Sequence, residues 1–361
     1  MVESDLEGPW VRADHAFDVV SRLVPGGERV FQVLSTYDDI RFFLEKAPGY
    51  EPGDTLMLVA PILLAHGVND SSLAEVARAP ENTGVIPGAI ETIRYLRERG
   101  AFYLISTSYR QYVTHAAEIL GVPLSDTYCT SFPIDELREG VDEGDISLVR
   151  QWTGRIAGMP DIEVDGAGGI RDDCVEYKEL LDEFFWEILP ETSFAAVMEE
   201  VKPVGGRRKF QALQETLTRQ GKDLEAARVI GDSITDSVML ERASEAGGLA
   251  LSFNGNRYSI PSSNVALLSG NCWATAAVLE ICRLAGLEGL RDLIEEPGDF
   301  LQKAMSAGIE VPLVERLASE FRDPVSHPRA FWVDSANQEA LVKESEAFRR
   351  KIRGTRIGSL G

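Results

Sequence analysis

Short apolar runs of strand length alternate with helical patterns through much of the chain. Residues 101–106 (AFYLIS) follow a helical stretch, 88–100, that ends in Arg-Glu-Arg-Gly, and basic residues in a last turn with glycine just beyond are signals that a helix ends. Strands and helices in alternation are typical of a parallel sheet covered by helices. We therefore predict an α/β fold, with further strands at 227–231, 248–253 and 265–268 and further helices at about 110–120 and 208–220.

Three regions depart from this alternation. Residues 12–84 have the pattern of helices, and residues 133–200 are acidic with helical patches. Residues 269–361 have the pattern of a helical tail that ends in a basic stretch, 349–356. We predict a core within residues 1–268, interrupted by a helical cap at about 12–84 and a second insertion at 133–200, and followed by a helical C-terminal extension at 269–361.

The size and charge of the chain narrow the classes of function. At 361 residues it is longer than one ordinary domain, and its 44% apolar and 26% charged residues are normal for a folded protein. A net charge of −22 repels the phosphate backbone of nucleic acids and anionic lipid, so we expect neither as a partner. The longest apolar run, 56–65, is too short to span a bilayer, so we expect a buried helix and no membrane insertion.

The N-terminal segment and the cysteines indicate a cytoplasmic protein. The first residues, MVESDLEGPW, lack the basic and apolar regions of a signal peptide. The cysteines form neither a CxxC pair nor a cluster with histidine, as expected of reduced thiols in the cytosol. The four are Cys129, Cys174, Cys272 and Cys282.

The segment Gly-Asp-Ser-Ile-Thr-Asp at 231–236 carries the strongest signal of chemistry. It follows the apolar run ARVI directly, which puts Asp232 and Asp236 at the carboxyl end of a predicted parallel strand, where open α/β sheets bind ligands. Two carboxylates at that place suit Mg²⁺, which prefers oxygen ligands. The alternative is a turn whose aspartates cap the next helix.

Three further segments carry weaker signals. Asp5 and Glu7 could divide the roles of nucleophile and acid–base group, or could belong to an exposed acidic end. Ser106, Thr107 and Ser108 stand at the end of a predicted strand, where hydroxyl and N–H groups can hold a phosphate or cap the next helix. Lys209 opens a predicted helix, where it could neutralise a phosphate or extend into solvent.

The order of these segments resembles that of the haloacid dehalogenase superfamily. DLEGPW at 5–10 is similar to the first motif of the superfamily, DxDGT, and LIS at 104–106 is similar to the second. The helix that begins near Lys209 corresponds to the third motif and GDSITD to the fourth. The resemblance covers the core and implies a Rossmann-like parallel sheet with cap insertions. A narrower resemblance, carried by DLEGPWVRADHAF, ISTSY and VKPVGG, is to an archaeal-type member labelled subunit R of energy-converting hydrogenase A.

The resemblance implies a covalent mechanism on the first motif. Asp5 would attack a phosphoryl group and carry it as an aspartyl-phosphate, with Glu7 as the acid and base. Mg²⁺ would bind between Asp5, the backbone carbonyl of Glu7 and Asp232, with Asp236 in support. Mg²⁺ is therefore the expected cofactor.

The resemblance also implies which residues bind the substrate. Ser106, Thr107 and Lys209 would hold the phosphoryl oxygens. Asp14 lies nine residues after Asp5, where phosphoserine phosphatases have an acidic residue that contacts the substrate, and it is equally placed to cap the helix that follows. The two insertions would close over the site and exclude water.

Two departures from the first motif leave a choice of functions. Glu7 stands where the superfamily has aspartate, and Pro9 stands where it has threonine. The presence of all four motifs favours a Mg²⁺-dependent phosphatase of a small phosphorylated metabolite, with a phosphomutase as a variant. The alternative is a non-catalytic or regulatory subunit that binds a phosphorylated ligand or, through the C-terminal helices, a protein partner.

Overall fold

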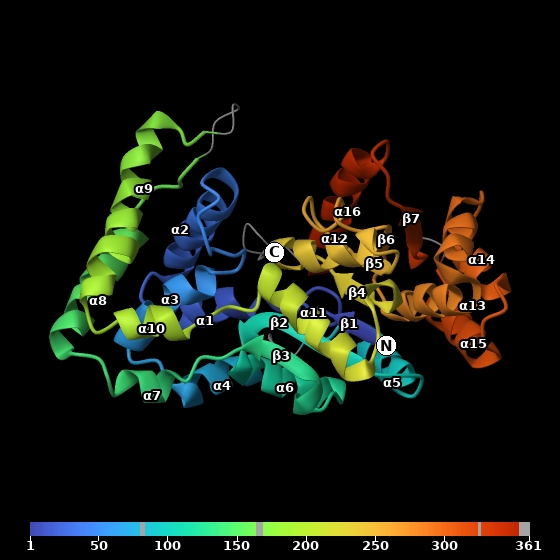
Figure 1. Cartoon of the computed structure of the whole chain (residues 1–361), viewed down its shortest axis with the longest axis horizontal. Helices are drawn as coiled ribbons and strands as arrows, with labels where there is room; N and C mark the ends of the chain where they lie inside the picture. Colours follow the sequence, from blue (N-terminus) through green and yellow to red (C-terminus); the bar gives the residue numbers. More distant parts are fainter. Residues whose placement is uncertain (80–83, 164–168, 324–325, 354–361) are drawn as a thin grey trace.

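The computed structural model describes residues 1–79, 84–163, 169–323 and 326–353, and a seven-stranded sheet lies at its centre (Figure 1). The strand order is β3-β2-β1-β4-β5-β6-β7, and neighbouring strands are parallel except for the pair β6 and β7. This sheet, with helical insertions and C-terminal helices, confirms the predicted Rossmann-like α/β fold. The strands are β1 (Val2–Ser4), β2 (Phe102–Tyr109), β3 (Thr127–Thr130), β4 (Arg228–Gly231), β5 (Leu249–Phe253), β6 (Val265–Leu268) and β7 (Arg329–Trp332).

The shortest of these strands, β1, lies inside the sheet, between β2 and β4. Its three residues are all buried, and Ser4 is in register with Leu104 of β2 on one side and Ile230 of β4 on the other. Pairing on both sides satisfies the backbone of a segment that is only weakly apolar. Because β2 and β3 follow on one side and β4, β5 and β6 on the other, the strand order switches beside β1. Open α/β sheets bind ligands at such a switch point.

Successive residues of the strands face two different layers of helices. Leu104 and Leu251 belong to a hydrophobic cluster on one face, whereas Ile105 and Ala250 belong to a second cluster on the other face. The sheet is therefore covered on both sides, as parallel sheets usually are. The first face is covered by α5 (Ala89–Arg97), α6 (Arg110–Leu120) and α13 (Trp273–Glu295), and the second by α11 (Arg207–Gln220) and α12 (Ser237–Glu245).

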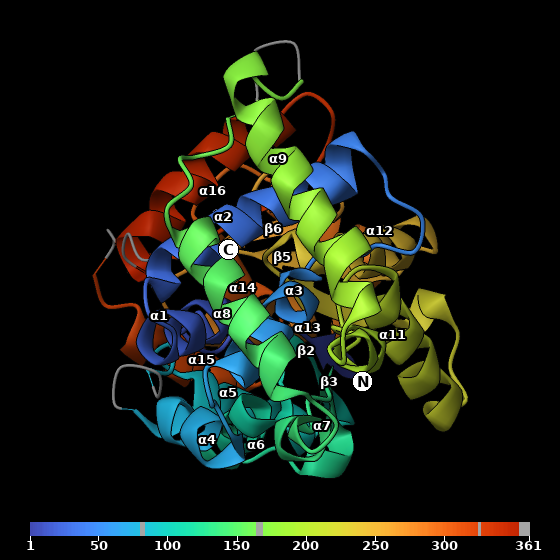
Figure 2. The same ribbon diagram turned by 90° about the vertical axis from the view of Figure 1, so that its left-hand side faces the viewer.

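The two predicted insertions pack together as one helical lobe beside the sheet (Figures 1 and 2). Leu34 from the first and Trp152 from the second belong to the same hydrophobic cluster. Local sequence patterns do not record such long-range packing. The lobe comprises α1 (His15–Leu23), α2 (Gly27–Asp39), α3 (Thr55–Ala65), α7 (Ile134–Arg138), α8 (Glu143–Ala157), α9 (Val175–Asp182) and α10 (Ala195–Glu200), with π-helical turns at Ile40–Leu44 and Glu183–Ile188.

The longest apolar run of the sequence forms α3, and every residue of this helix is buried. The next helix, α4 (Asp70–Arg78), packs on α6. Among the residues that the structure describes, no single helix is long and apolar enough to cross a membrane. The pair α3 and α4 meets that test of length and composition jointly, but the two helices are bent by 117° at the break between them.

The C-terminal extension is mainly helical but also adds a strand to the sheet. β7 pairs antiparallel with β6, with Trp332 opposite Val265. We did not predict this strand from the sequence. Its four residues form too short a pattern, and the strand is held in place by pairing with the edge of β6. In Figure 1, α13, α14 (Phe300–Ser306) and α15 (Val311–Glu320) lie at the end of the molecule opposite the helical lobe. The last helix, α16 (Gln338–Arg353), returns to the sheet, and residues 354–356 of the basic stretch lie outside the described residues.

Candidate active site

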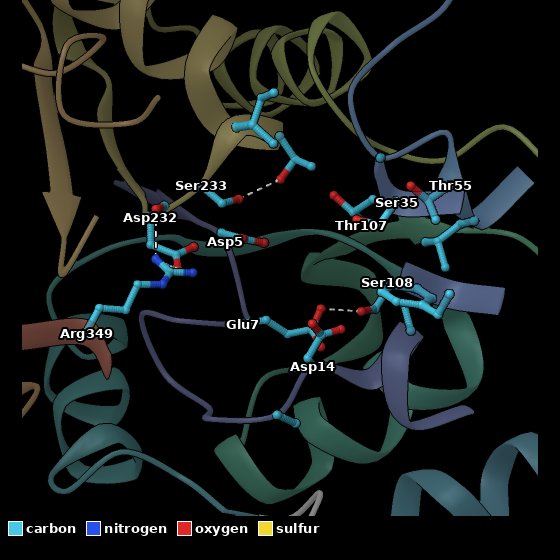
Figure 3. A pocket seen from close by; sticks show the side chains of 17 residues that line it. Asp5, Glu7, Asp14, Ser35, Thr55, Thr107, Ser108, Asp232, Ser233 and Arg349 are labelled. Carbon is cyan, nitrogen blue, oxygen red and sulfur yellow. Dashed lines mark hydrogen bonds and ion pairs between the residues drawn. The ribbon is translucent and has the colours of Figure 1, made fainter. Parts of the chain in front are cut away.

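A pocket lies at the carboxyl ends of β1 and β4, between the sheet and the helical lobe (Figure 3). Asp5 follows β1 directly, and its N–H donates to the Ile230 carbonyl at 2.9 Å, while Asp232 follows β4. The first and fourth motifs therefore meet at the switch point of the sheet. The loops after the strands contribute Asp5, Glu7, Thr107, Ser108 and Asp232 to the pocket lining, the lobe with the residue that caps α1 contributes Asp14, Phe31, Ser35, Thr55 and Leu56, and the C-terminal extension contributes Arg349.

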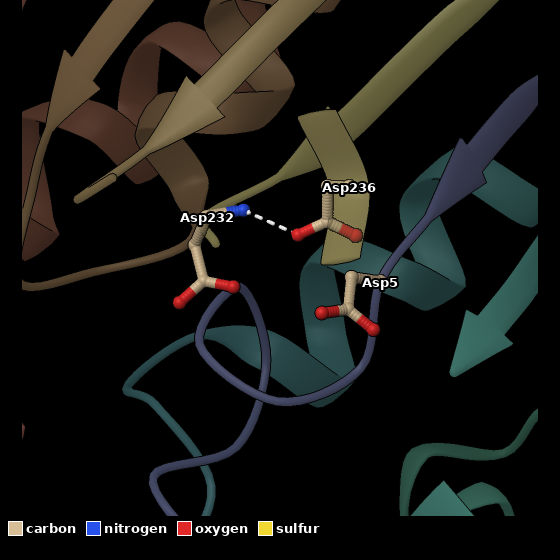
Figure 4. A group of neighbouring side chains, drawn as sticks. All are labelled: Asp5, Asp232 and Asp236. Atoms are coloured by element: carbon tan, nitrogen blue, oxygen red, sulfur yellow. Dashed lines mark hydrogen bonds between the residues drawn. The ribbon is translucent and has the colours of Figure 1, made fainter. Parts of the chain in front are cut away.

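Three buried carboxylates converge at one end of this pocket (Figure 4). One oxygen from each of Asp5, Asp232 and Asp236 lies within 4.8 Å of the others. Asp236 accepts from the backbone N–H groups of Asp232 at 2.9 Å and Ser233 at 3.0 Å, so it braces the loop. Hard carboxylate oxygens on Asp5 and Asp232 fit a divalent cation such as Mg²⁺.

Glycine in the first motif allows this close approach of the two loops. Gly8 has a φ of 101°, a conformation that other residues rarely adopt. A Cβ at Gly8 would lie 2.0 Å from Asp232 Oδ2, which is too close for any contact. The loop after β1 can therefore pass the Asp232 carboxylate only with glycine at this position.

Lys209 lies buried between Asp5, the candidate nucleophile, and Asp236. Its Nζ is 2.7 Å from Asp5 Oδ1 and 2.7 Å from Asp236 Oδ1. Burial opposes the charge on this lysine, but Asp236 and Asp5 outweigh burial and raise the pKa of Lys209. Burial and the charge of Asp236 in turn raise the pKa of Asp5, while Lys209 opposes that rise. Further positive charge at this site would therefore favour the ionised, nucleophilic form of Asp5.

Glu7 is held by two hydrogen bonds beside the pocket. Its Oε1 accepts the backbone N–H of His15 at 2.8 Å, and its Oε2 accepts the hydroxyl of Ser108. The group of neighbouring carboxylates contains Asp5, Asp232 and Asp236 and not the Glu7 side chain. The Glu7 carboxylate is thus placed as a separate group, on the side of the pocket where α1 begins.

The predicted hydroxyl segment lies at the end of β2. Thr107 lines the pocket and donates to the Val204 carbonyl at 2.9 Å. Ser106 is fully buried, and its hydroxyl accepts the N–H of Ser108 at 3.1 Å. Ser108, the third residue of the predicted segment, lines the pocket together with Thr107.

Asp14 caps α1, which is one of the two roles that the sequence left open. It lines the pocket, and its Oδ1 accepts the N–H of Phe17 at 3.2 Å as the N-cap of α1. The carboxylate that caps the helix is therefore also part of the pocket lining.

Arg349, from the basic stretch near the end of the chain, is a pocket residue that we did not predict from the sequence. This buried arginine lines the pocket, and its Nη1 lies 2.6 Å from Asp232 Oδ2. The same nitrogen donates to the backbone carbonyls of Asp232 at 3.0 Å and Asn254 at 3.2 Å. One signal was available: Leu341, Ser345 and Arg349 recur at four-residue intervals, the spacing of one helix face.

No family model and no curated protein matches this sequence. Among solved structures, gene product AF1437 from Archaeoglobus fulgidus is similar with a TM-score of 0.78 and 26% identity, over 100% of this chain and 98% of that one. This likeness extends through the helical lobe and the C-terminal extension as well as the sheet. It supports the fold of the whole chain.

Two phosphatase structures are similar at a lower level. A phospho-aspartyl intermediate analogue of phosphoserine phosphatase has a TM-score of 0.43 and 15% identity, over 73% of this chain and 91% of that one. A probable phosphoserine phosphatase from Vibrio cholerae has a TM-score of 0.41 and 14% identity, over 85% of this chain and 65% of that one. Likeness at this level carries no argument about activity, so the reaction has to be inferred from the site.

Proposed function

We propose that this protein is a Mg²⁺-dependent phosphatase of the haloacid dehalogenase type that acts on a small phosphorylated metabolite through an aspartyl-phosphate on Asp5. The observation that carries the proposal is the setting of Asp5, a buried carboxylate in a pocket with Lys209 Nζ at 2.7 Å and Asp232 beside it. Phosphoryl transfer is catalysed mainly by positioning and by neutralising charge, and these groups supply both.

In the first proposed step, an oxygen of Asp5 forms a bond to phosphorus while the bond from phosphorus to the leaving oxygen breaks. Glu7 begins this step protonated and gives its proton to the leaving oxygen. In the second step, water attacks phosphorus, Glu7 takes up a proton from that water, and the bond to Asp5 breaks to release phosphate. The His15 N–H and the Ser108 hydroxyl orient Glu7 for both transfers. The metal, held by Asp5 and Asp232, would supply positive charge to the phosphoryl oxygens.

The helical lobe limits the size and character of the proposed substrate. Phe31 and Leu56 give the lobe side of the pocket an apolar wall, and Ser35 and Thr55 add hydroxyl groups. Asp14, the N-cap of α1, lines the pocket near Glu7 (Figure 3). We therefore expect a small phosphate ester with a polar or cationic group at its far end.

Phosphate release from a panel of phosphorylated metabolites, with and without Mg²⁺, tests the proposal. We expect release that requires Mg²⁺ for at least one small ester. After brief exposure to labelled substrate and acid quenching, the wild type should carry label, and Asp5→Asn should carry none. A wild type that neither turns over nor takes up label from any substrate would instead fit the regulatory subunit.

We also propose that the chain groups with the archaeal-type members labelled subunit R of energy-converting hydrogenase A. The support is the set of shared segments, including DLEGPWVRADHAF and VKPVGG, and the end-to-end likeness to an archaeal gene product. An alignment of those members that lacks these segments would remove the grouping.

A further inference from the structure

The last helix, α16, reaches the candidate active site through one face. Leu341 packs in a small cluster with Ile260 and Ala266, and the Ser345 hydroxyl donates to the Gly255 carbonyl at 2.6 Å. About one turn beyond Ser345, Arg349 reaches Asp232. The loops that follow β4 and β5 are thus covered by a helix that belongs to the C-terminal extension rather than to the core.

The cations in this site are divided between its carboxylates. Lys209 contacts Asp5 and Asp236, whereas Arg349 contacts Asp232. Both partners of the second contact are buried, with side-chain exposures of 3% for Arg349 and 2% for Asp232. Attraction and repulsion between charges are much stronger in such a place than in water. A divalent cation at Asp232 would therefore meet a guanidinium that already holds one oxygen of the same carboxylate.

We propose that Arg349 is an internal counter-ion that competes with the divalent metal for Asp232, so that metal binding and the docking of α16 oppose each other. The inference rests on the metal site of the proposed function. Thermodynamic linkage makes this opposition reciprocal. The factor by which Arg349 lowers the affinity for the metal equals the factor by which bound metal lowers the equilibrium constant for docking of α16. Arg349 thus acts as a positioning residue through Asp232, and it sets the Mg²⁺ concentration at which the site fills.

Calorimetric titration of the full chain with Mg²⁺, in the absence of substrate, measures the competition directly. Arg349→Met removes the charge but keeps much of the apolar stem, and it should bind Mg²⁺ more tightly than the wild type by roughly 5- to 150-fold, the usual range of such coupling. Arg349→Lys keeps a cation and should remain close to the wild type. Arg350→Met, an equal loss of charge from the neighbouring exposed position, is the matched control and should also bind like the wild type.

Hydrogen exchange of the wild type provides a second measurement that needs no substitution. Saturating Mg²⁺ should speed exchange across residues 338–353, and Asp232→Asn should abolish both Mg²⁺ binding and this response. The inference is overturned if Arg349→Met binds Mg²⁺ as the wild type does, or more weakly, or if Mg²⁺ protects α16. Equal Mg²⁺ binding in all the Arg349 and Arg350 variants would reject only the role of Arg349. Absence of Mg²⁺ binding in every variant would reject the metal site itself, and this inference with it.

Discussion

At the scale of single residues, the proposed reaction depends on Glu7 as well as on the nucleophile. Glu7→Gln keeps the shape of the side chain but cannot exchange a proton, so turnover should fall by about 10²–10⁴-fold. Mg²⁺ affinity should hardly change, because the Glu7 side chain lies outside the group of carboxylates that fits the metal. Steady-state kinetics on the best substrate and calorimetry with Mg²⁺ separate the two quantities.

Two further variants sharpen this prediction. Glu7→Asp shortens the side chain and should weaken its contacts with His15 and Ser108, so activity should fall if the site is built for glutamate. Ser108→Ala removes one hydrogen bond that Glu7 accepts, and it should lower turnover less than Glu7→Gln does. Turnover of Glu7→Gln at the wild-type rate would show that another group carries the proton.

At the scale of the elements, the loop before α3 connects the helical lobe to the start of α11. Arg208 Nη1 lies 2.5 Å from Asp54 Oδ1, and Asp54 is 2% exposed. Asp54 Oδ2 also accepts the backbone N–H of Glu51 at 2.9 Å, which shapes the loop. Arg207 forms a second ion pair across the same junction, with Glu51. These two ion pairs hold the lobe against the start of α11, where Lys209 is the next residue after Arg207 and Arg208.

We expect Arg208→Met to lower the free energy of unfolding by about 1–3 kcal/mol, because it leaves the buried Asp54 carboxylate without its charged donor. Adding Asp54→Asn should recover part of that loss. Urea unfolding of both single variants and the double variant gives the coupling energy. Arg219→Met, at the exposed end of the same helix, should stay within about 0.5 kcal/mol of the wild type. A double-variant loss equal to the sum of the two single losses would contradict a direct contact.

What the sequence could predict at this scale follows from how local each signal is. The strands β2, β4, β5 and β6 and the loop of Asp232 were predictable because apolar runs and the residues at their ends are read within a few positions. The convergence of Asp5 with Asp232 was predictable because parallel strands bring their carboxyl ends to one edge. Strand β7 and the contact of Arg349 with Asp232 were not, since each depends on a partner far away in the chain.

At the scale of the whole molecule, a buried acid in the lobe makes stability depend on pH. Asp38 of α2 accepts the N–H of Gly53, a pocket residue, at 3.2 Å. Burial raises the pKa of Asp38 to about 8 from an ordinary value of 3.8, and the negative charge of Asp54 adds to the rise. The folded state therefore keeps a proton that the unfolded state releases above pH 3.8.

From this residue we expect the free energy of unfolding to fall as pH rises between about 4 and 8, by at most about 1.4 kcal/mol per pH unit. Asp38→Asn cannot ionise and should flatten that part of the profile, so its advantage over the wild type should grow toward pH 8. Urea unfolding at several pH values measures both profiles. The exposed Asp172→Asn should leave the slope unchanged. Parallel profiles for the wild type and Asp38→Asn would show that Asp38 ionises in the folded protein as it does in the unfolded one.

The central place of β1 in the sheet makes synthesis on the ribosome part of the folding problem. β1 ends at Ser4, but its second partner, β4, begins only at Arg228. At about 5–20 residues per second, roughly 10–45 s pass between their appearance. During that time a nascent chain can pair β1 with β2, but the other edge of β1 stays open, and open edges are templates for pairing with other chains. The strand that leads to Asp5 is therefore the segment that a chaperone would need to shield longest.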